Sequence, residues 1–174
     1  VVIKLDRLDK RELLGVTAHH PRWALAWKFP PEEAVTVLME VFWQTGRTGN
    51  VTPVSRVAPV VVSGVTVENT TLHNRGEVER LGIKVGDKVR VVRRGDVIPK
   101  ITEVLGPATE QDLRGRAHAD GTSFSETLPD SIEIPIPETC PRCSKELIED
   151  GAFIRCTNID CPSRLERSIL YWCR

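Results

Sequence analysis

Four cysteines in two closely spaced pairs are the residues of this sequence with the most specific chemistry. Cys140 and Cys143 have two residues between them, Cys156 and Cys161 have four, and twelve residues separate the pairs. Four thiolates at such spacing can surround one ion, and zinc prefers a tetrahedral sulfur shell that leaves no position open to water or substrate. The spacing therefore predicts a structural zinc site, with iron–sulfur ligation as the alternative. We expect Cys173 to be a small buried apolar residue outside this site.

Two lysines at the ends of short predicted strands suggest a second kind of chemistry. Side chains alternate between the faces of a strand, so Lys28 shares a face with Ala24 and Ala26. The bulky residues of that strand are expected on a core face: Trp23, Leu25, Trp27 and Phe29. An ammonium group above a floor of small side chains suits a phosphate, and Lys4 likewise lies opposite Ile3. A solvated sheet face is the alternative for both lysines.

Length, charge and cysteine use limit the class of protein. The chain has 174 residues, with 24 basic and 24 acidic side chains, so nucleic-acid binding would have to come from local patches. No apolar run approaches the roughly 20 residues of a membrane span. Clustered cysteines indicate metal binding inside the cell and not disulfides. We therefore expect a globular cytoplasmic protein with no membrane span.

The middle of the chain has the pattern of a small β-barrel. Strands are expected from residue 35 to a turn at 46–50, through the β-branched stretch 51–67, and over 88–93 and 97–105. In the second of these, Pro53, Pro59 and Gly64 fit bulged or edge positions. This number of short strands around one helix predicts an OB-fold, a Greek-key barrel used on nucleic acids, with an SH3-like barrel as the alternative.

The helix within this pattern has recognisable ends. Asn74 is a good N-cap, Glu77 follows at capping-box spacing, and Gly82 stands after Leu81 as a C-terminal stop. Around this helix, residues 75–103 contain eight Lys or Arg against five acids, which predicts a local basic patch.

Residues 106–138 differ in composition from the barrel. They contain seven acidic residues and two arginines, with few apolar residues before Ile132. We expect an acidic loop over about 106–131 that runs along the surface and is partly mobile, then a strand at 132–136.

Six short motifs occur in an order that resembles the bacterial NAD-dependent DNA ligases. They are Val1-Val2-Ile3-Lys4, Trp27-Lys28-Phe29-Pro30, Gly46-Arg47-Thr48-Gly49, Thr71-Leu72-His73-Asn74, Gly95-Asp96-Val97-Ile98-Pro99 and the four-cysteine cluster. The resemblance implies the C-terminal end of an adenylation (nucleotidyltransferase) domain at 1–34, an OB domain at 35–137, and a zinc finger from 138 to 174 with the start of a helical region. The implied fold class is mainly β.

The resemblance also implies an activity. Enzymes of this family seal nicks between a 5′-phosphate and a 3′-hydroxyl in duplex DNA, through enzyme-AMP and DNA-AMP intermediates, in replication and repair. NAD, zinc, and magnesium or manganese are the implied cofactors. The implied partner is nicked duplex DNA, and the implied setting is a monomer associated with the nucleoid in the bacterial cytoplasm.

Particular residues match positions with roles in that family. Lys4 and Lys28 match the lysines that contact the phosphate of the bound nucleotide, where they would neutralise charge during phosphoryl transfer. The nucleophilic lysine of the family has no match in this chain, which we expect to be inactive by itself and to be a piece of a longer protein.

The matches in the barrel imply contacts with DNA. Arg47 and Thr48 match DNA contacts of the first turn, and Arg93 matches a DNA-contacting arginine. The apolar pair Val97 and Ile98 matches a wedge laid into the minor groove beside the nick. Arg94 stands where a small residue is expected, and it adds a charge beside the wedge, where we expect it to contact DNA as well.

Two other classes of protein are alternatives. A non-catalytic module that binds single strands predicts aromatic side chains on the barrel face, where the sequence offers only Phe42 and Trp43 before Phe124. A zinc-dependent assembly domain with a purely structural role would leave Arg47, Arg93 and Arg94 without a function.

Overall fold

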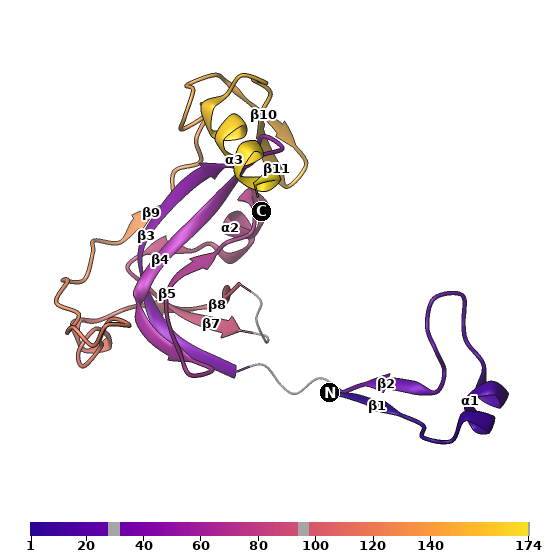
Figure 1. Cartoon of the computed structure of the whole chain (residues 1–174). Coiled ribbons are helices and arrows are strands. Elements are labelled where there is room, and N and C mark those ends of the chain that lie inside the picture. The colour runs from indigo at the N-terminus through magenta and orange to yellow at the C-terminus, as the bar shows by residue number, and fades with distance from the viewer. Residues whose placement is uncertain (28–31, 94–97, 174) are drawn as a thin grey trace. The chain divides into compact units, whose positions relative to one another are not determined.

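The computed structural model describes residues 1–27, 32–93 and 98–173, and the chain divides into two units, 1–31 and 32–174. Figure 1 labels the helices and strands of both units. Lys28, Arg94 and Val97, three of the residues with implied roles, lie outside the described residues. No helix in the described part of the chain is long and apolar enough to cross a membrane.

The smaller unit is a two-stranded antiparallel ribbon. Strand β1 (Val2–Lys4) pairs with β2 (Ala24–Ala26), and helix α1 (Leu8–Leu14) lies in the connection. Lys4 pairs with Ala24 in the register, and directly paired residues point to the same face of a sheet. The small-residue face expected beside this lysine is therefore present.

The opposite face of the ribbon is open, contrary to the expectation of a core face. Leu25, Trp27 and Ile3 are 59%, 56% and 54% exposed. A two-stranded ribbon has no second layer of its own to cover a bulky face, because it takes three strands or a packed helix to bury one. Trp23 is partly covered, by the Arg11 guanidinium 4.7 Å from its ring centroid.

The larger unit is built on a closed five-stranded barrel. Its strands are β3 (Glu32–Thr45), β4 (Asn50–Val62), β5 (Val65–Thr71), β7 (Asp87–Arg93) and β8 (Lys100–Pro107). They follow the order β4-β3-β7-β8-β5, and β4 pairs again with β5 to close the barrel. The pairing of β5 with β8 is parallel, through Thr71 and Lys100, and the other pairings are antiparallel. This is the strand order of an OB-fold, which the sequence pattern predicted, and not of an SH3-like barrel.

Turns and bulges shape the barrel where the sequence pattern placed them. Ser63 and Gly64 join β4 to β5 with φ angles of 53° and 72°, the paired positive values of a tight hairpin turn. The register of β4 against β5 shifts between Arg56 and Val60, around Pro59. A proline cannot donate to the sheet and suits such a bulge, so its predicted role is confirmed.

The barrel interior is filled by aliphatic side chains from every strand. Leu38, Leu72, Val89 and Ile101 are fully buried there. Helix α2 (Arg75–Leu81) contributes Val78 to the same cluster. The helix therefore packs against the barrel and is held in place by it.

The ends of α2 agree with the predicted caps, with one difference. The Asn74 side chain accepts a hydrogen bond from Glu77 N at 2.9 Å, and Gly82 ends the helix in the left-handed region at φ 57°. The second half of a capping box is absent, because Asn74 N donates to Leu72 O. The Glu77 carboxylate is therefore available for other partners.

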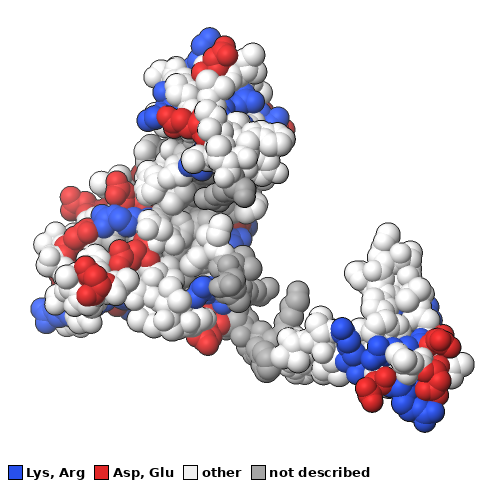
Figure 2. All heavy atoms as spheres, in the orientation of Figure 1, with Lys and Arg blue, Asp and Glu red and all other residues white. Residues whose placement is uncertain are grey.

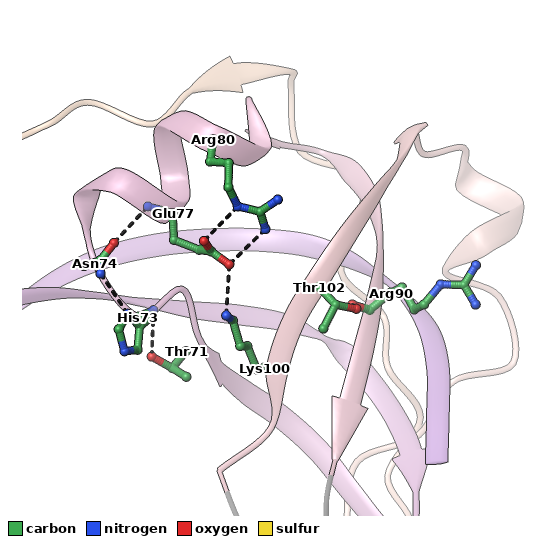
Figure 3. A network of polar contacts seen from close by, with 8 residues as sticks. All are labelled: Thr71, His73, Asn74, Glu77, Arg80, Arg90, Lys100 and Thr102. Atoms are coloured by element: carbon green, nitrogen blue, oxygen red, sulfur yellow. Dashed lines mark hydrogen bonds and ion pairs between the residues drawn. The ribbon is translucent and has the colours of Figure 1, made fainter. Parts of the chain in front are cut away.

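Glu77 instead joins α2 to strand β8 (Figure 3). Its carboxylate accepts hydrogen bonds from Arg80 Nε and Nη2, at 2.9 and 3.0 Å, and forms an ion pair with Lys100 Nζ at 2.9 Å. Hydrogen bonds from Arg80 and Lys100 lower the pKa of Glu77 to about 2. Thr71 N also donates to Pro99 O at 3.1 Å, so two contacts fix the chain where it enters β8.

The acidic segment after β8 lies mostly exposed at the surface, as expected, and part of it packs against the barrel. Leu113 is 4% exposed in a second core with Val37, Met39 and Ala58, and Phe124 and Leu128 pack against it. The Arg116 guanidinium donates to the backbone oxygens of Asp112, Pro59 and Val35. Few apolar residues suffice here because the outer face of the barrel supplies the other half of the cluster.

Secondary structure in this segment is short. The 3-10 helix η1 spans Glu110–Asp112. Strand β9 (Ile132–Glu133) pairs with β6 (Lys84–Val85), so the strand expected over 132–136 is only two residues long.

The C-terminal module consists of a hairpin and a helix. Strand β10 (Leu147–Asp150) pairs with β11 (Phe153–Cys156), and helix α3 (Pro162–Trp172) follows. Strand β11 also pairs with β4, through Ile154 with Val51 and Arg155 with Asn50. Figure 1 shows the module gathered at the end of the long ribbon of β3 and β4, where these two strands join.

The Glu77 network predicts a stability that depends on pH. Because the folded pKa lies below the ordinary value of 4.5, the contribution is present above about 4.5 and is lost as pH falls towards about 2. We expect Glu77→Gln to lower the unfolding free energy by about 2 kcal/mol at neutral pH, with a difference from the parent that shrinks in acid. Urea unfolding across acidic and neutral buffers measures this.

Glu79→Gln is the matched control, because Glu79 pairs with Arg75 at the exposed surface of the same helix. Its cost should stay below about 1 kcal/mol. Equal losses for the two variants, or a Glu77 effect independent of pH, would contradict the network's role.

Candidate metal centre and nucleic-acid interface

The four predicted cysteines meet at one point of the C-terminal module. Their sulfurs lie within 4.8 Å of one another, with 3.6 Å between Cys143 and Cys156 and 3.9 Å between Cys140 and Cys161. A zinc ion with bonds of about 2.3 Å holds its four sulfurs roughly 3.8 Å apart. The cluster thus has the size of a tetrahedral zinc shell.

Hydrogen bonds to the sulfurs favour thiolates, whereas burial acts against them and raises the pKa of Cys161. Backbone N–H groups of Ser163 and Arg164, at the start of α3, donate to Cys161, and Thr45 Oγ1 lies 3.2 Å from Cys140 Sγ. Hydrogen bonds from the Asn158 side chain and a backbone N–H lower the pKa of Cys143 to about 6. Donors of this kind, directed at three of the four cysteines, are what a metal-bound thiolate requires.

Burial acts in the opposite direction at Cys156. It is fully buried, and desolvation raises the pKa of its thiol to about 12. A buried thiolate at this position needs a cation beside it. Cys140, Cys156 and Cys161 also form the small core of the module with Val51 and Ile154.

Cys173 is separate from the cluster but is not buried. It caps the C-terminal end of α3 and is exposed. Its prediction as a buried residue is wrong, because the described part of the chain places nothing over the end of this helix.

The turn from Gly46 to Gly49 joins β3 to β4 and presents two of the implied DNA-contacting residues. Both Arg47 and Thr48 are exposed. Gly46 N donates to Asn50 O, and Gly49 N to Gly46 O, which closes the turn.

The other implied DNA contacts lie at the opposite end of β3. Arg93 ends β7 and pairs with Glu32, the first residue of β3. Ile98 is 70% exposed just before β8. A strand rises about 3.3 Å per residue, so the fourteen residues of β3 keep these two groups apart. The structure therefore places the two groups of implied DNA contacts at opposite ends of one strand, and not in one cluster.

The predicted basic patch is largely neutralised. Six of its eight basic residues are paired with carboxylates: Arg75, Arg80, Lys84, Lys88, Arg90 and Lys100. Some of the acids come from distant segments: Glu33, Asp112, Glu133 and Glu149. On the face shown in Figure 2, basic and acidic side chains of the larger unit are correspondingly interspersed. Counting charges within 75–103 could not reveal partners from outside that window.

Two arginines of α3 were missed by the sequence reasoning. Among the described residues, Arg164 and Arg167 contact backbone oxygens and the Gln44 side chain, and neither pairs with a carboxylate. They are three residues apart and so share a face of the helix. The sequence signal that could have identified these two arginines is their close spacing after Cys161.

Lys4 lies on the small-residue face of β1 and β2 and is exposed. Ala24 and Ala26 of the neighbouring strand leave open space beside it. The ammonium group can therefore reach a ligand placed against this face.

The fold and the cysteine cluster define an OB-fold protein that carries a four-cysteine module of the right size to hold a metal ion. Comparison with known families gives two matches: the NAD-dependent DNA ligase adenylation domain over residues 1–32 and the NAD-dependent DNA ligase OB-fold domain over residues 35–112. The chain belongs to the NAD-dependent DNA ligase family.

Individual relatives agree with this assignment. The chain is 41% identical over 172 residues to the DNA ligase of Aliarcobacter butzleri (strain RM4018), covering 99% of this chain and 24% of the relative. It is 47% identical over 171 residues to the DNA ligase of Erythrobacter litoralis (strain HTCC2594), covering 96% of this chain and 20% of the relative. The chain thus spans about a quarter or less of the length of these curated relatives.

The cluster predicts one zinc ion per chain, held by all four cysteines. Cys156→Ser should abolish stoichiometric zinc, whereas Cys173→Ser should leave it unchanged because that sulfur lies outside the shell. Metal analysis of the purified variants measures both. Loss of metal with Cys173, or full zinc in the Cys156 variant, would overturn the ligand set.

Proposed function

We propose that this chain is the part of an NAD-dependent DNA ligase that grips nicked duplex DNA and completes the nucleotide pocket. The observation that carries the proposal is the ordered match to the family's adenylation and OB-fold domains. We further propose domain limits of 1–34, 35–137 and 138–174. The motif series also supports magnesium or manganese as the divalent ion, and a monomer acting at the nucleoid of the bacterial cytoplasm.

The DNA would be held at two points on the barrel. Arg47 and Thr48 mark one end of β3, and Arg93 and Ile98 mark the other. The fourteen residues of β3 span at most about 45 Å. One turn of duplex is about 34 Å long. Contacts at the two ends of one strand therefore suit successive stretches of a single duplex.

Most basic residues of the 75–103 patch are neutralised, which supports a DNA contact made by particular arginines and not by the patch as a whole. A carboxylate partner cancels the long-range attraction of a lysine or arginine for phosphate, as at Arg90 and Lys88. Arg47 has no such partner among the described residues. Its charge is thus available for a phosphate.

The apolar contact would come from the loop before β8. Ile98 is exposed, and the chain beyond it is fixed by the Thr71 and Lys100 contacts. An apolar side chain on an anchored loop can enter a minor groove without a large ordering cost. We propose Val97 as its partner in this wedge, and Arg94 as an added charge beside it.

The lysines would act in adenylyl transfer. Lys4, and Lys28 by its match to the family motif, would place ammonium groups against the phosphate of the nucleotide. Charge that grows on phosphoryl oxygens during transfer is stabilised by such groups. Zinc would be held by the four cysteines and would stabilise the module without taking part in the chemistry.

The two kinds of DNA contact should differ in salt dependence. We expect Arg47→Ala and Arg93→Ala to weaken binding of nicked duplex and to reduce the salt slope by about one ion each. Replacing Ile98 with Ser should weaken binding with no change in slope, because it removes apolar contact only. Fluorescence anisotropy across a salt series measures both quantities.

Arg114→Ala is the matched control, because Arg114 is an exposed arginine of the acidic segment that belongs to neither proposed contact point. It should leave affinity and slope unchanged. Equal slope changes for Arg47→Ala and Ile98→Ser would contradict the wedge assignment.

The nucleotide assignment can be tested in a chimera in which this chain replaces the matching segment of the Aliarcobacter butzleri DNA ligase. Lys4→Ala should slow enzyme adenylylation and the sealing of a pre-adenylylated nick by on the order of a hundredfold, with DNA affinity unchanged. Lys28→Ala should do the same. Single-turnover assays with labelled NAD measure the rates.

Lys10→Ala is the control, because Lys10 is an exposed lysine on α1 of the same unit. It should act like the parent chimera. Normal rates in the Lys4 and Lys28 variants would remove both from the nucleotide pocket.

A further inference from the structure

The turn that carries Arg47 is held from outside the barrel, by the four-cysteine module. Strand β11 extends the sheet next to β4, and Cys156 N donates to Gly49 O at 2.8 Å. Gly49 has φ 89°, and a Cβ there would lie 2.4 Å from Cys156 O. Only glycine lets the turn and the metal-binding strand approach this closely.

Arg164 connects α3 to the same turn. Its Nη1 donates to Asn158 O at 3.1 Å and makes a longer contact of 3.4 Å with Cys156 O. Its Nε lies 3.4 Å from Arg47 O. One planar guanidinium thus joins the backbone of the turn to two points of the module.

Further contacts join the module to the strand that leads into the turn. Ser163 Oγ donates to Thr45 O at 2.8 Å, and Arg167 Nη2 donates to the Gln44 side chain at 2.9 Å. The last two residues of β3 before the turn are therefore both fixed by α3.

The Arg47 side chain is held by the end of α3. Its guanidinium carbon lies 4.1 Å from the centroid of the Tyr171 ring. The N–H donors of a guanidinium point outward around its edge, so stacking on an aromatic face leaves them able to bind phosphate. The ring orients the cation without neutralising it, which a carboxylate would do.

We propose that Arg164 and Tyr171 are positioning residues that hold the Gly46–Gly49 turn and the Arg47 guanidinium ready for a DNA phosphate. This inference rests on the proposed function, in which Arg47 contacts DNA. It adds a task for the cysteine module, which sets the geometry of a contact made by the barrel. A preset turn and side chain bind more tightly, because less conformational freedom is lost on binding.

A double-mutant cycle on binding of nicked duplex tests the role of Tyr171. Tyr171→Leu should weaken binding about three- to fivefold, the range of an exposed cation–π contact. In the Arg47→Ala background the same change should have no effect, because the side chain it positions is gone. Tyr171→Phe keeps the ring and should behave as the parent.

Arg164→Lys separates positioning from direct charge contact. An ammonium keeps the charge but lacks the planar fork in which Nε reaches the turn while Nη1 reaches the module. The variant should weaken binding if Arg164 acts through the turn, and should leave affinity unchanged if only its charge matters. Its effect should shrink in the Arg47→Ala background.

The outcomes separate this inference from the proposed function. If Arg47→Ala leaves affinity unchanged, the DNA contact and the positioning role both fail. If Arg47→Ala weakens binding but Tyr171→Leu has no effect, or an equal effect in both backgrounds, only the positioning role fails.

A readout without DNA guards against misfolded variants. The Arg47 δ protons should show a ring-current shift by NMR in the parent and in Tyr171→Phe, and should lose it in Tyr171→Leu. Zinc content should remain stoichiometric in all of these variants. An unshifted Arg47 signal in the parent would overturn the stacking on which the role depends.

Discussion

The long antiparallel pairing of β3 with β4 is the interaction on which the rest of the larger unit depends. The first half of β3 pairs with β7 and the second half with β4, so one strand closes the barrel and extends beyond it. At the far end of this pair, β4 supplies the edge on which β11 adds. The barrel core, the cysteine module and both proposed DNA contacts are therefore fixed to a single backbone. A shift of one residue in this register would turn Leu38 and the other buried side chains to the outside.

Ion pairs with carboxylates cancel the charge of some basic residues in this unit and leave others able to attract an anion. Most lysines and arginines around α2 and β7 are held by carboxylates, and Glu77 alone binds two of them. Such pairs connect elements but remove attraction for an anion. Three basic side chains near the 46–49 turn, those of Arg47, Arg164 and Arg167, are held instead by backbone oxygens, an amide and an aromatic ring. These partners orient a cation and leave its charge intact, so the side chain can still attract an anion.

Local sequence signals predicted much of this architecture correctly. The Asn74 and Gly82 caps, the Pro59 bulge and the cysteine spacing each depend on the chemistry of one residue or a short interval, which a sequence displays directly. The attachment of the acidic segment to the barrel was not predicted, for the opposite reason. Leu113 and Arg116 are ordered by Val35, Val37 and Pro59, which are far away in the chain.

By itself, the sequence determined the barrel class, the ligand-type cysteines and the family, because periodicity, turn residues and motif order are local properties. Only the tertiary structure decided which charges are cancelled and which remain. It also decided that Arg47 and Ile98 lie at opposite ends of one strand, and that the cysteine module holds the turn bearing Arg47. Ion pairs, stacking and strand addition join residues separated by dozens of positions. Their partners are chosen by how the chain folds back on itself, and no local pattern records that choice.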